Sequence, residues 1–364
     1  MKQLLLLLSI VLLTLSCAPK NDGFVIHGFI DGIKDSALIT LYDLSQQVDI
    51  DTAYAFNGEF VLKGMVDQPT GCWIRCNGES VIIQMENTKF SFKSPLENMN
   101  LYSEIIGGKE QELQNELMKL QKPFDLLFQD AYDSLINQKY SNDTEQMNLI
   151  NRINESQSTS HEIYVNYGIE HSYSYMGLNI VYMNRNSIPR DTLKRVYENL
   201  PSPLCETQNA NALRTYVYEK SVEVGHPYID FEVKTIDGRD FKLSSLDGRY
   251  IYLSFWSAGC GPCRIENRFL SKHYNAVPEE LSIVSFSIDK NEDNWMSASK
   301  SDSVIWHNIS DGEGSNGRIK TQYQVQAIPT SFLIDKEGTV IKRFKGYDPE
   351  KNLLEELEAI INNL

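Results

Sequence analysis

Cysteine and histidine are scarce in this sequence, and they are not spaced in the pairs that a metal site needs. The 364 residues include six cysteines and six histidines, and no two histidines form an HxxxH pair. One pair, Cys260 and Cys263, has the two-residue gap of a zinc knuckle, but no second such pair accompanies it. A structural zinc site needs four ligands, so the sequence excludes the usual kinds.

Positively charged residues are also fewer than negatively charged ones. The chain carries 34 Lys and Arg residues against 49 Asp and Glu residues, a formal net charge of −15. Nucleic-acid binding requires a concentrated basic surface, so we expect no nucleic-acid partner. Hydrophobic residues nevertheless make up 41% of the chain, which is enough to bury substantial cores in two or three domains.

The sequence lacks an apolar run long enough to cross a membrane. The most apolar stretch, Leu4–Leu13, is interrupted by Ser9 and falls short of the ~20 residues that a spanning helix needs. Lys2 precedes it, and a positive start followed by a short apolar run predicts a secretory signal peptide over residues 1–16. We therefore expect the mature protein outside the cytoplasm, where disulfides persist.

The signal peptide runs into the tetrapeptide TLSC, which resembles a bacterial lipobox. In that motif a small residue, here Ser16, precedes the cysteine that becomes lipidated, here Cys17, whereas Thr14 and Leu15 depart from the usual aliphatic and small residues. The resemblance implies a periplasm-facing lipoprotein anchored to a membrane. Ala18 stands where an aspartate often retains lipoproteins in the inner membrane, which favours the outer membrane. The alternative is an ordinary cleaved signal.

Three segments follow. Residues 24–107 contain short runs rich in β-branched and aromatic residues, separated by turn dipeptides, and predict a small antiparallel β-sandwich-like domain. Over residues 108–221 apolar residues recur every three or four positions, which predicts helices, the first of which Pro123 should kink or divide. Strands and helices alternate over 222–364, which predicts an α/β domain.

Two further cysteines, Cys72 and Cys76, lie in the strand-like segment CWIRC. Residues four apart on a strand are separated by about 13 Å. A disulfide requires Cα atoms within about 7 Å. We therefore expect Cys72 and Cys76 to be buried free thiols rather than bonded to each other.

The pair Cys260 and Cys263 follows an apolar strand and begins a helix, in the segment SFWSAGCGPCRIE at 254–266. A disulfide across so short a ring stabilises a fold poorly, because its benefit grows with loop length. The helix N-terminus favours the thiolate of Cys260, which is the attacking species. Cys263 lies one turn further on, where it can attack Cys260 in a second step. The pattern predicts redox catalysis.

These residues resemble a TlpA/ResA-type thioredoxin domain. The resemblance includes the CGPC motif, the upstream DGRDFKL hairpin and the later QAIPTSFLID segment, and it covers about 222–364. It implies a thioredoxin fold, with Cys260 as nucleophile and Cys263 as resolving cysteine. The β segment resembles, less strongly, a domain of unknown function that precedes such thioredoxins in many bacterial lipoproteins.

The resemblance also implies roles for residues around the pair. Pro329 matches the cis-proline that faces the disulfide, and Ile328 matches the residue whose backbone pairs with substrate. Trp256 matches the aromatic end of the strand beneath the site, and we expect all three residues to take part in substrate binding.

The proton acceptor for Cys263 is left open. Ser254 stands where thioredoxins bury an aspartate, and Lys234 stands where ResA-like proteins place a glutamate. Glu232 and Glu266 are the two candidates to take that part.

We expect a periplasmic thiol–disulfide oxidoreductase that reduces protein disulfides, with no metal or organic cofactor beyond the Cys260–Cys263 disulfide. The implied partners are cysteine-containing envelope proteins and, as electron donor, a membrane thiol-transfer protein of the DsbD or CcdA type. One alternative is an envelope lipoprotein that binds a ligand or partner through residues 24–221, with a subordinate redox domain. The other is a thiol peroxidase, although SAGCGPC lacks the threonine that such enzymes place ahead of their cysteine.

Overall fold

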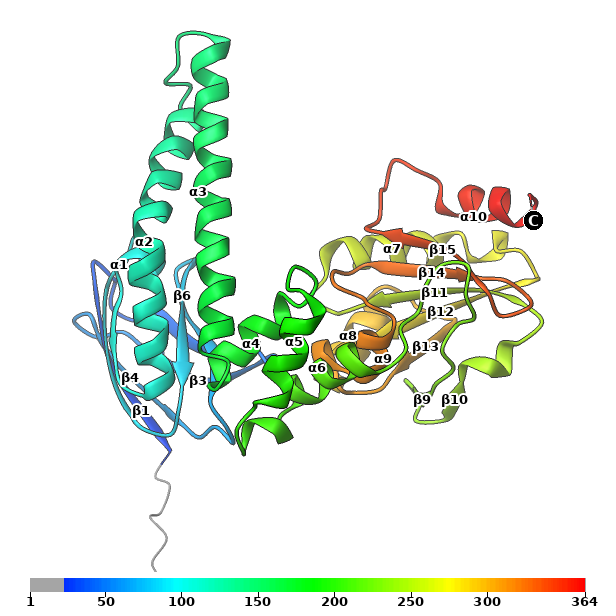
Figure 1. Cartoon of the computed structure of the whole chain (residues 1–364), viewed down its shortest axis with the longest axis horizontal. Helices are drawn as coiled ribbons and strands as arrows, with labels where there is room; N and C mark the ends of the chain where they lie inside the picture. The colour runs from blue at the N-terminus through cyan, green and yellow to red at the C-terminus, as the bar shows by residue number, and fades with distance from the viewer. Residues whose placement is uncertain (1–22, 364) are drawn as a thin grey trace, which may run out of the picture.

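The computed structural model describes residues 23–363, which form two lobes connected by short helices (Figure 1). The expected signal peptide over 1–16 and the expected lipidation site Cys17 lie outside the described residues. Within the described part of the chain, no helix has both the length and the apolar character needed to cross a membrane.

The N-terminal lobe is a β-sandwich of two four-stranded sheets, ordered β4-β1-β7-β8 and β3-β2-β5-β6 within residues 23–363. Side chains of strands such as β4 and β7 alternate between the core and the surface, because successive residues point to opposite faces. The strands are β1 Phe24–Asp31, β2 Leu38–Asp43, β3 Val48–Tyr54, β4 Glu59–Gly64, β5 Thr70–Cys76, β6 Glu79–Met85, β7 Lys89–Pro95 and β8 Glu104–Ile106.

Two details of this sandwich differ from the sequence-based expectation. The pairing is antiparallel except between β1 and β7, which run parallel because the long chain between them can return in either direction. Strand β3 alternates apolar and acidic residues, Val48 and Ile50 with Asp49 and Asp51, yet none of its residues is fully buried, so this alternation does not mark a core face. Cys72 and Cys76 are buried free thiols on β5, as expected.

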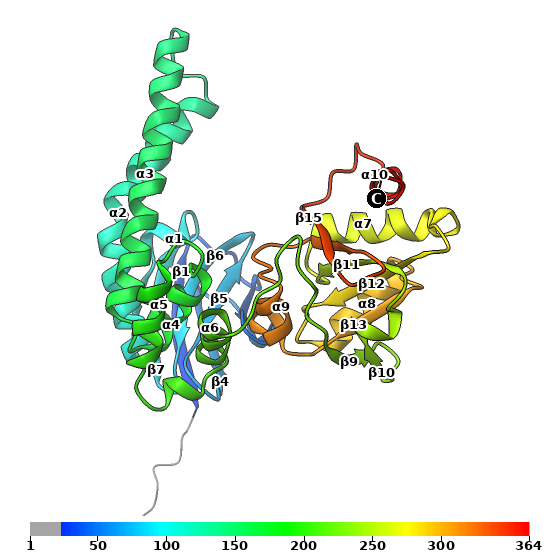
Figure 2. The same ribbon diagram turned by 45° about the vertical axis from the view of Figure 1, so that its right-hand side comes forward.

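A helical region follows the sandwich. Helices α2 and α3 form an antiparallel hairpin that stands out from the β lobe, which Figures 1 and 2 show from two sides. The helices are α1 Met99–Tyr102, α2 Lys109–Ile136, α3 Asp143–Glu170, α4 Tyr175–Met183, α5 Arg190–Glu198 and α6 Gln208–Tyr218.

Pro123 lies inside α2 without dividing it, so of the two expected effects, a kink or a division, the division is wrong. A proline removes one helical hydrogen bond. Contacts with α3 lie on both sides of Pro123. Gln121 Nε2 donates to Ser160 Oγ at 3.0 Å before the proline, and Arg152 pairs with Asp130 at 2.9 Å beyond it.

The C-terminal lobe has the predicted α/β architecture. Its seven-stranded sheet is ordered β10-β9-β13-β12-β11-β14-β15 within the described residues, with β11, β12 and β13 parallel and β14 antiparallel to β11. The elements are β9 Glu232–Thr235, β10 Asp240–Lys242, β11 Tyr250–Trp256, α7 Gly261–Lys272, β12 Leu281–Ser287, α8 Glu292–Ser301, β13 His307–Ser310, α9 Arg318–Gln322, β14 Thr330–Ile334, β15 Val340–Lys345 and α10 Leu353–Ile361.

Strand β11 is buried on both faces of this sheet, which explains its continuous apolar sequence. Tyr252 packs in a cluster with Leu270 of α7 and Leu357 of α10. Leu253 and Phe255 point the other way, into a cluster with Tyr323 that follows α9. The C-terminal end of β11 is thereby held rigidly from both sides.

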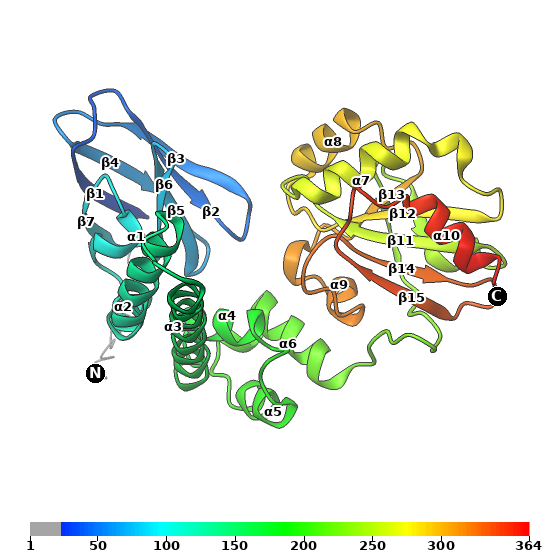
Figure 3. The ribbon, with the colours of Figure 1, turned by 90° about the horizontal axis from the view of Figure 1, so that it is seen from above.

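The helical region is attached to the C-terminal lobe through α9, next to which α6 lies in Figure 3. The Tyr182 hydroxyl is 2.9 Å from Thr321 Oγ1 in a buried contact. Glu219, directly after α6, accepts hydrogen bonds from Arg318 and Gln322, both at 2.9 Å. These polar contacts fix the helical region against the side of the sheet on which α9 lies.

Candidate active site

The end of β11 and the start of α7 place the two cysteines. Cys260 is the N-cap residue of α7, and Pro262 occupies the first turn, where a missing N–H costs nothing. Cys260 and Cys263 are joined in a disulfide with their Cα atoms 5.3 Å apart. The Cys263 N–H points at Cys260 Sγ at 3.2 Å, which would stabilise a thiolate there once the disulfide is reduced.

The two sulfurs differ in accessibility. Cys260 is half-buried, whereas Cys263 is 1% exposed. Gly259 and Gly261, on either side of Cys260, are exposed and have open space where a side chain would project. Cys260 is therefore accessible to an incoming molecule, whereas Cys263 is not.

The loop that leads into the neighbouring strand β14 faces the disulfide. The Ile328–Pro329 peptide bond is cis, and the carbonyl oxygen of Ile328 lies 3.6 Å from Cys260 Sγ. Antiparallel pairing of Phe255 with Thr330 brings this loop beside the end of β11. The Thr330 hydroxyl donates to the Ala327 carbonyl at 2.7 Å and so holds the loop in shape.

Trp256 lies at the end of β11 beneath the site, as the resemblance implies, but it does not have the substrate-binding role expected of it. It is 1% exposed and packs beneath the disulfide with Cys263, Trp295 and Ala298. A side chain in that position cannot touch a bound protein, so the expectation that Trp256 binds substrate is wrong. The reason is the strand alternation, which directs Trp256 to the inner face that α7 covers.

Glu266 is the buried carboxylate of the site. It lies one turn beyond Cys263 on α7, 2% exposed, and its Oε1 accepts hydrogen bonds from Tyr252 and Ser254, both at 3.0 Å. Ser331 donates to Ser254 at 3.0 Å, which completes a buried chain of polar groups. Burial raises the pKa of Glu266 to about 7, although the two hydrogen bonds act in the opposite direction.

Glu232, the other candidate acceptor, does not approach the cysteines. It is exposed on β9, where it pairs with Lys242 of β10. Strands β13 and β12 separate β9 from β11 in the sheet. Lys234, on the same strand, forms an ion pair with Asp240 at the surface. The structure thus contradicts the assignment of Glu232 as proton acceptor.

Three residues that the sequence interpretation missed hold the loop before Cys260. Asp289 is 4% exposed and accepts a hydrogen bond from the Ala258 N–H at 2.8 Å. Arg264 donates to the Ala258 carbonyl at 3.2 Å and is itself anchored by the buried Asp302. The position of Asp289 directly after a buried strand is the signal that could have revealed it.

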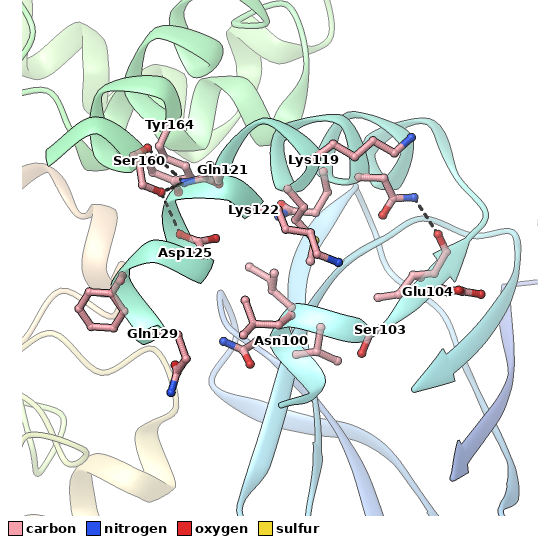
Figure 4. Close-up of a pocket in the computed structure, with 18 of the residues that line it drawn as sticks. Asn100, Ser103, Glu104, Lys119, Gln121, Lys122, Asp125, Gln129, Ser160 and Tyr164 are labelled. Atoms are coloured by element: carbon pink, nitrogen blue, oxygen red, sulfur yellow. Dashed lines mark hydrogen bonds between the residues drawn. The ribbon is translucent and has the colours of Figure 1, made fainter. Parts of the chain in front are cut away.

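A cavity of about 860 Å³, away from the two cysteines, lies in the N-terminal part of the protein between α1, β8 and the α2–α3 hairpin. Figure 4 shows Gln121, Asp125 and Ser160 on one wall, connected by hydrogen bonds, and Asn100 and Ser103 on the other. Among the described residues that line it there is no cysteine, so it is separate from the redox chemistry.

The structure thus has a CxxC disulfide at the start of a helix that follows a central strand, opposite a cis-proline loop. These features define a thioredoxin-like domain. Among residues 23–363, no three side chains of the metal-binding types converge.

Comparison with known proteins agrees with this class. Residues 224–343 match the AhpC/TSA family, and residues 24–114 match a domain of unknown function (DUF4369). Thiol-disulfide oxidoreductase ResA from Bacillus thuringiensis subsp. konkukian is 29% identical over 146 residues, which are 40% of this chain and 83% of that protein. ResA from Geobacillus thermodenitrificans is 25% identical over 146 residues, 40% of this chain and 82% of its own.

Among solved structures, this chain is similar to the thioredoxin domain of a thiol-disulfide oxidoreductase from Bacteroides vulgatus. The match covers 39% of this chain and 100% of that domain, with 26% identity and a TM-score of 0.36. The family and sequence matches show that the C-terminal part of this chain is a thioredoxin-like domain similar to the ResA-type thiol–disulfide oxidoreductases, and that a domain of the DUF4369 type precedes it.

Proposed function

We propose that the protein is a periplasmic reductase of protein disulfides that works through Cys260 and Cys263, with their disulfide as its redox group and no other cofactor. The observation that carries the proposal is the half-buried Cys260 at the N-terminus of α7, beside the Ile328 carbonyl and above the buried Cys263. The test is reduction of a protein disulfide by the dithiol form of the chain, compared with chains that lack either cysteine.

The proposed reaction has two exchange steps. The Cys260 thiolate attacks one sulfur of the substrate disulfide, the substrate S–S bond breaks, and the other substrate sulfur leaves as a thiolate and takes a proton. Cys263 then loses its proton and attacks Cys260 Sγ, which releases the second substrate sulfur. Two electrons have passed to the substrate, and the Cys260–Cys263 disulfide remains.

Glu266 is the proposed acceptor of the Cys263 proton. It is buried on the same side of α7 and one turn away, and with a pKa of about 7 it can both take and release a proton at neutral pH. Ser254 and Tyr252 fix its carboxyl group through Oε1. Their hydroxyl groups stabilise the ionised form, which is the form that accepts the proton.

The direction of electron flow follows from the residues between the cysteines. Gly261 and Pro262 supply no charged or hydrogen-bonding side chain, so the helix terminus and the Cys263 N–H are the main local groups that stabilise the Cys260 thiolate. A modest stabilisation of the thiolate leaves the disulfide comparatively stable and the dithiol reducing.

We predict a reduction potential close to that of thioredoxin, about −270 mV, rather than that of DsbA, about −120 mV. Equilibration of the whole chain with glutathione buffers measures the potential, and thiol titration of reduced protein measures the pKa of Cys260. A potential near that of DsbA, together with a thiol pKa near 3.5, would instead indicate an oxidase or isomerase.

We further propose that the mature chain is lipid-anchored at Cys17, with the outer membrane favoured over the inner, and that it acts on cysteine-containing envelope proteins. A reducing dithiol cannot remain reduced in an oxidising compartment without a source of electrons. A membrane thiol-transfer protein of the DsbD or CcdA type is the proposed donor.

Cys17→Ala should leave the precursor unprocessed or release the protein from membranes, because the thiol that would carry the lipid is absent. Fractionation of cells and labelling with a radioactive fatty acid measure this. Unchanged labelling in the variant would show that the lipobox assignment is wrong.

A second candidate function is ligand binding by residues 24–221, which the cavity of about 860 Å³ between α1, β8 and the α2–α3 hairpin favours. A chain in which both Cys260 and Cys263 are replaced should still bind such a ligand and still support growth if binding is the main role. For a thiol peroxidase, the remaining alternative, Cys260 alone should turn over hydrogen peroxide.

A further inference from the structure

A small cavity of about 220 Å³ opens beside the active-site loops, between the helical region and the C-terminal lobe. Ser257, Ala327 and Ile328 form one wall, so the cavity adjoins the residue whose carbonyl oxygen lies 3.6 Å from Cys260 Sγ. Gln47, from the turn between β2 and β3, also lines it. All three parts of the chain therefore meet at this point.

Arg185 reaches this cavity from the end of α4 and is 4% exposed. Its guanidinium lies 4.3 Å from the ring centroid of Tyr182 and 5.5 Å from that of Tyr216, and Nη1 donates to the Tyr182 carbonyl at 2.9 Å. Its Nε is buried without a hydrogen-bond partner. The aromatic rings hold the group in place but do not neutralise its charge.

Lys320, on α9, lines the same cavity and is 6% exposed. Burial and the neighbouring Arg185 lower its pKa to about 8, so it remains mostly protonated at pH 7. Among residues 23–363, no carboxylate forms an ion pair with either Lys320 or Arg185. The described lining of the cavity likewise includes no Asp or Glu.

Two buried cations without an anion are costly, because desolvation and mutual repulsion both act against them. Folds tolerate such groups where an incoming ligand supplies the missing charge. The chain is otherwise acidic, with a formal net charge of −15, so an unneutralised basic pair at this position stands out.

We propose that this cavity binds a carboxylate of the substrate protein, an Asp or Glu side chain close to the disulfide that Cys260 attacks. The proposal rests on the proposed reductase function and on the role that the resemblance implies for Ile328, whose backbone would pair with a substrate segment. Continued along Ala327 and Gln326, that segment passes the cavity lined by Arg185 and Lys320. The subsite makes the enzyme select disulfides with acidic neighbours.

Two peptide dimers test this, each joined by one disulfide and identical except for Glu or Gln beside the cysteine. Reduced wild-type protein should have a kcat/KM about tenfold higher for the Glu dimer, since a hydrogen bond to a charged group contributes more than a neutral one. Lys320→Met and Arg185→Met should each bring the ratio of the two values towards one. Lys351→Met, which changes a 73% exposed lysine, should leave the ratio at its wild-type value.

Thermal unfolding adds a second readout. Lys320→Met keeps the length of the side chain and removes an unpaired buried charge, so its Tm should equal or exceed that of wild type. A loss of the Glu preference without a loss of Tm separates a binding role from a structural one. A large fall in Tm would mean that Lys320 is structural and would overturn the proposal.

The remaining outcomes are also decisive. Equal kcat/KM values in wild type overturn the proposal while leaving the reductase function intact. If, in addition, inorganic phosphate raises the Tm of wild type but not of Lys320→Met, the cavity takes a free anion instead. If neither dimer is reduced, the proposed function fails. In that case the same peptides are made with serine in place of cysteine, and their binding to the oxidised chain is measured. A preference for the Glu peptide then tests the subsite without any reaction.

Discussion

Replacement of Cys263 by serine is expected to stop turnover and to accumulate mixed disulfides, whereas replacement of Cys260 should stop turnover and trap nothing. Both substitutions should lower the rate of disulfide reduction by at least about 1,000-fold, because each removes a sulfur that one of the two exchange steps requires. The difference in trapping follows from burial, since Cys260 is half-buried and Cys263 is 1% exposed. Reduction of insulin measures turnover, and non-reducing electrophoresis with mass spectrometry detects trapped partners.

Cys205→Ser is the matched control for this experiment. Cys205 is an exposed free thiol outside the C-terminal lobe, and its loss should change neither turnover nor trapping. If Cys260→Ser retains turnover, or if trapping in the Cys263→Ser chain depends on Cys205, the nucleophile is not Cys260. The proteins trapped through Cys260 would be identified as the physiological substrates. Their sequences beside the trapped cysteine would show whether acidic residues are enriched there.

Replacement of Glu266 by glutamine is expected to slow turnover about 100-fold at pH 7, because a positioned base is lost while Oε1 can still accept both hydrogen bonds. The wild-type rate should rise as the pH passes about 7 and the carboxyl group loses its proton. The glutamine variant should lack that rise. Stopped-flow measurement of the resolving step between pH 5 and pH 9 shows both effects.

The rate should rise with pH, whereas the stability of the folded protein should fall. The folded-state pKa of Glu266 is about 7 against an ordinary value of 4.5, so the folded state binds more protons between these values and stability falls as pH rises through them. The full cost above pH 7 is about 3 kcal/mol at 1.36 kcal/mol per pKa unit. Glu266→Gln should therefore raise the free energy of unfolding at pH 8 and change it little at pH 4, as urea titration can measure.

Glu232→Gln is the control for this pair of measurements. Glu232 is exposed on β9, so its replacement should alter neither the pH dependence of the rate nor the stability. If Glu232→Gln reproduces the loss of rate and Glu266→Gln does not, the proton acceptor lies on the hairpin after all. If Glu266→Gln destabilises the protein at pH 8, the hydrogen bonds to Glu266 outweigh its burial.

The chemistry of the site follows from local sequence. A CxxC pair that begins a helix after an apolar strand needs few tertiary contacts to be recognised, since strand, turn and first helical turn are adjacent in the chain. Ile328 and the cis-proline Pro329 are likewise adjacent in a short sequence motif. The β-sandwich and the helices were predictable for the same reason, because alternation and helical periodicity are local patterns.

Only the tertiary structure decided which distant groups meet these residues. Glu232 and Glu266 are both ordinary glutamates in the sequence. In the structure two strands separate Glu232 from β11, which leads to the cysteines, whereas Glu266 is buried against β11. Trp256 faces inward because of the sheet that forms around it. Arg185 and Lys320 are 135 positions apart and become a buried basic pair only when α4 and α9 pack beside the active-site loops. Periodicity records which face of an element is apolar, but the partner of that face is set by packing over the whole chain.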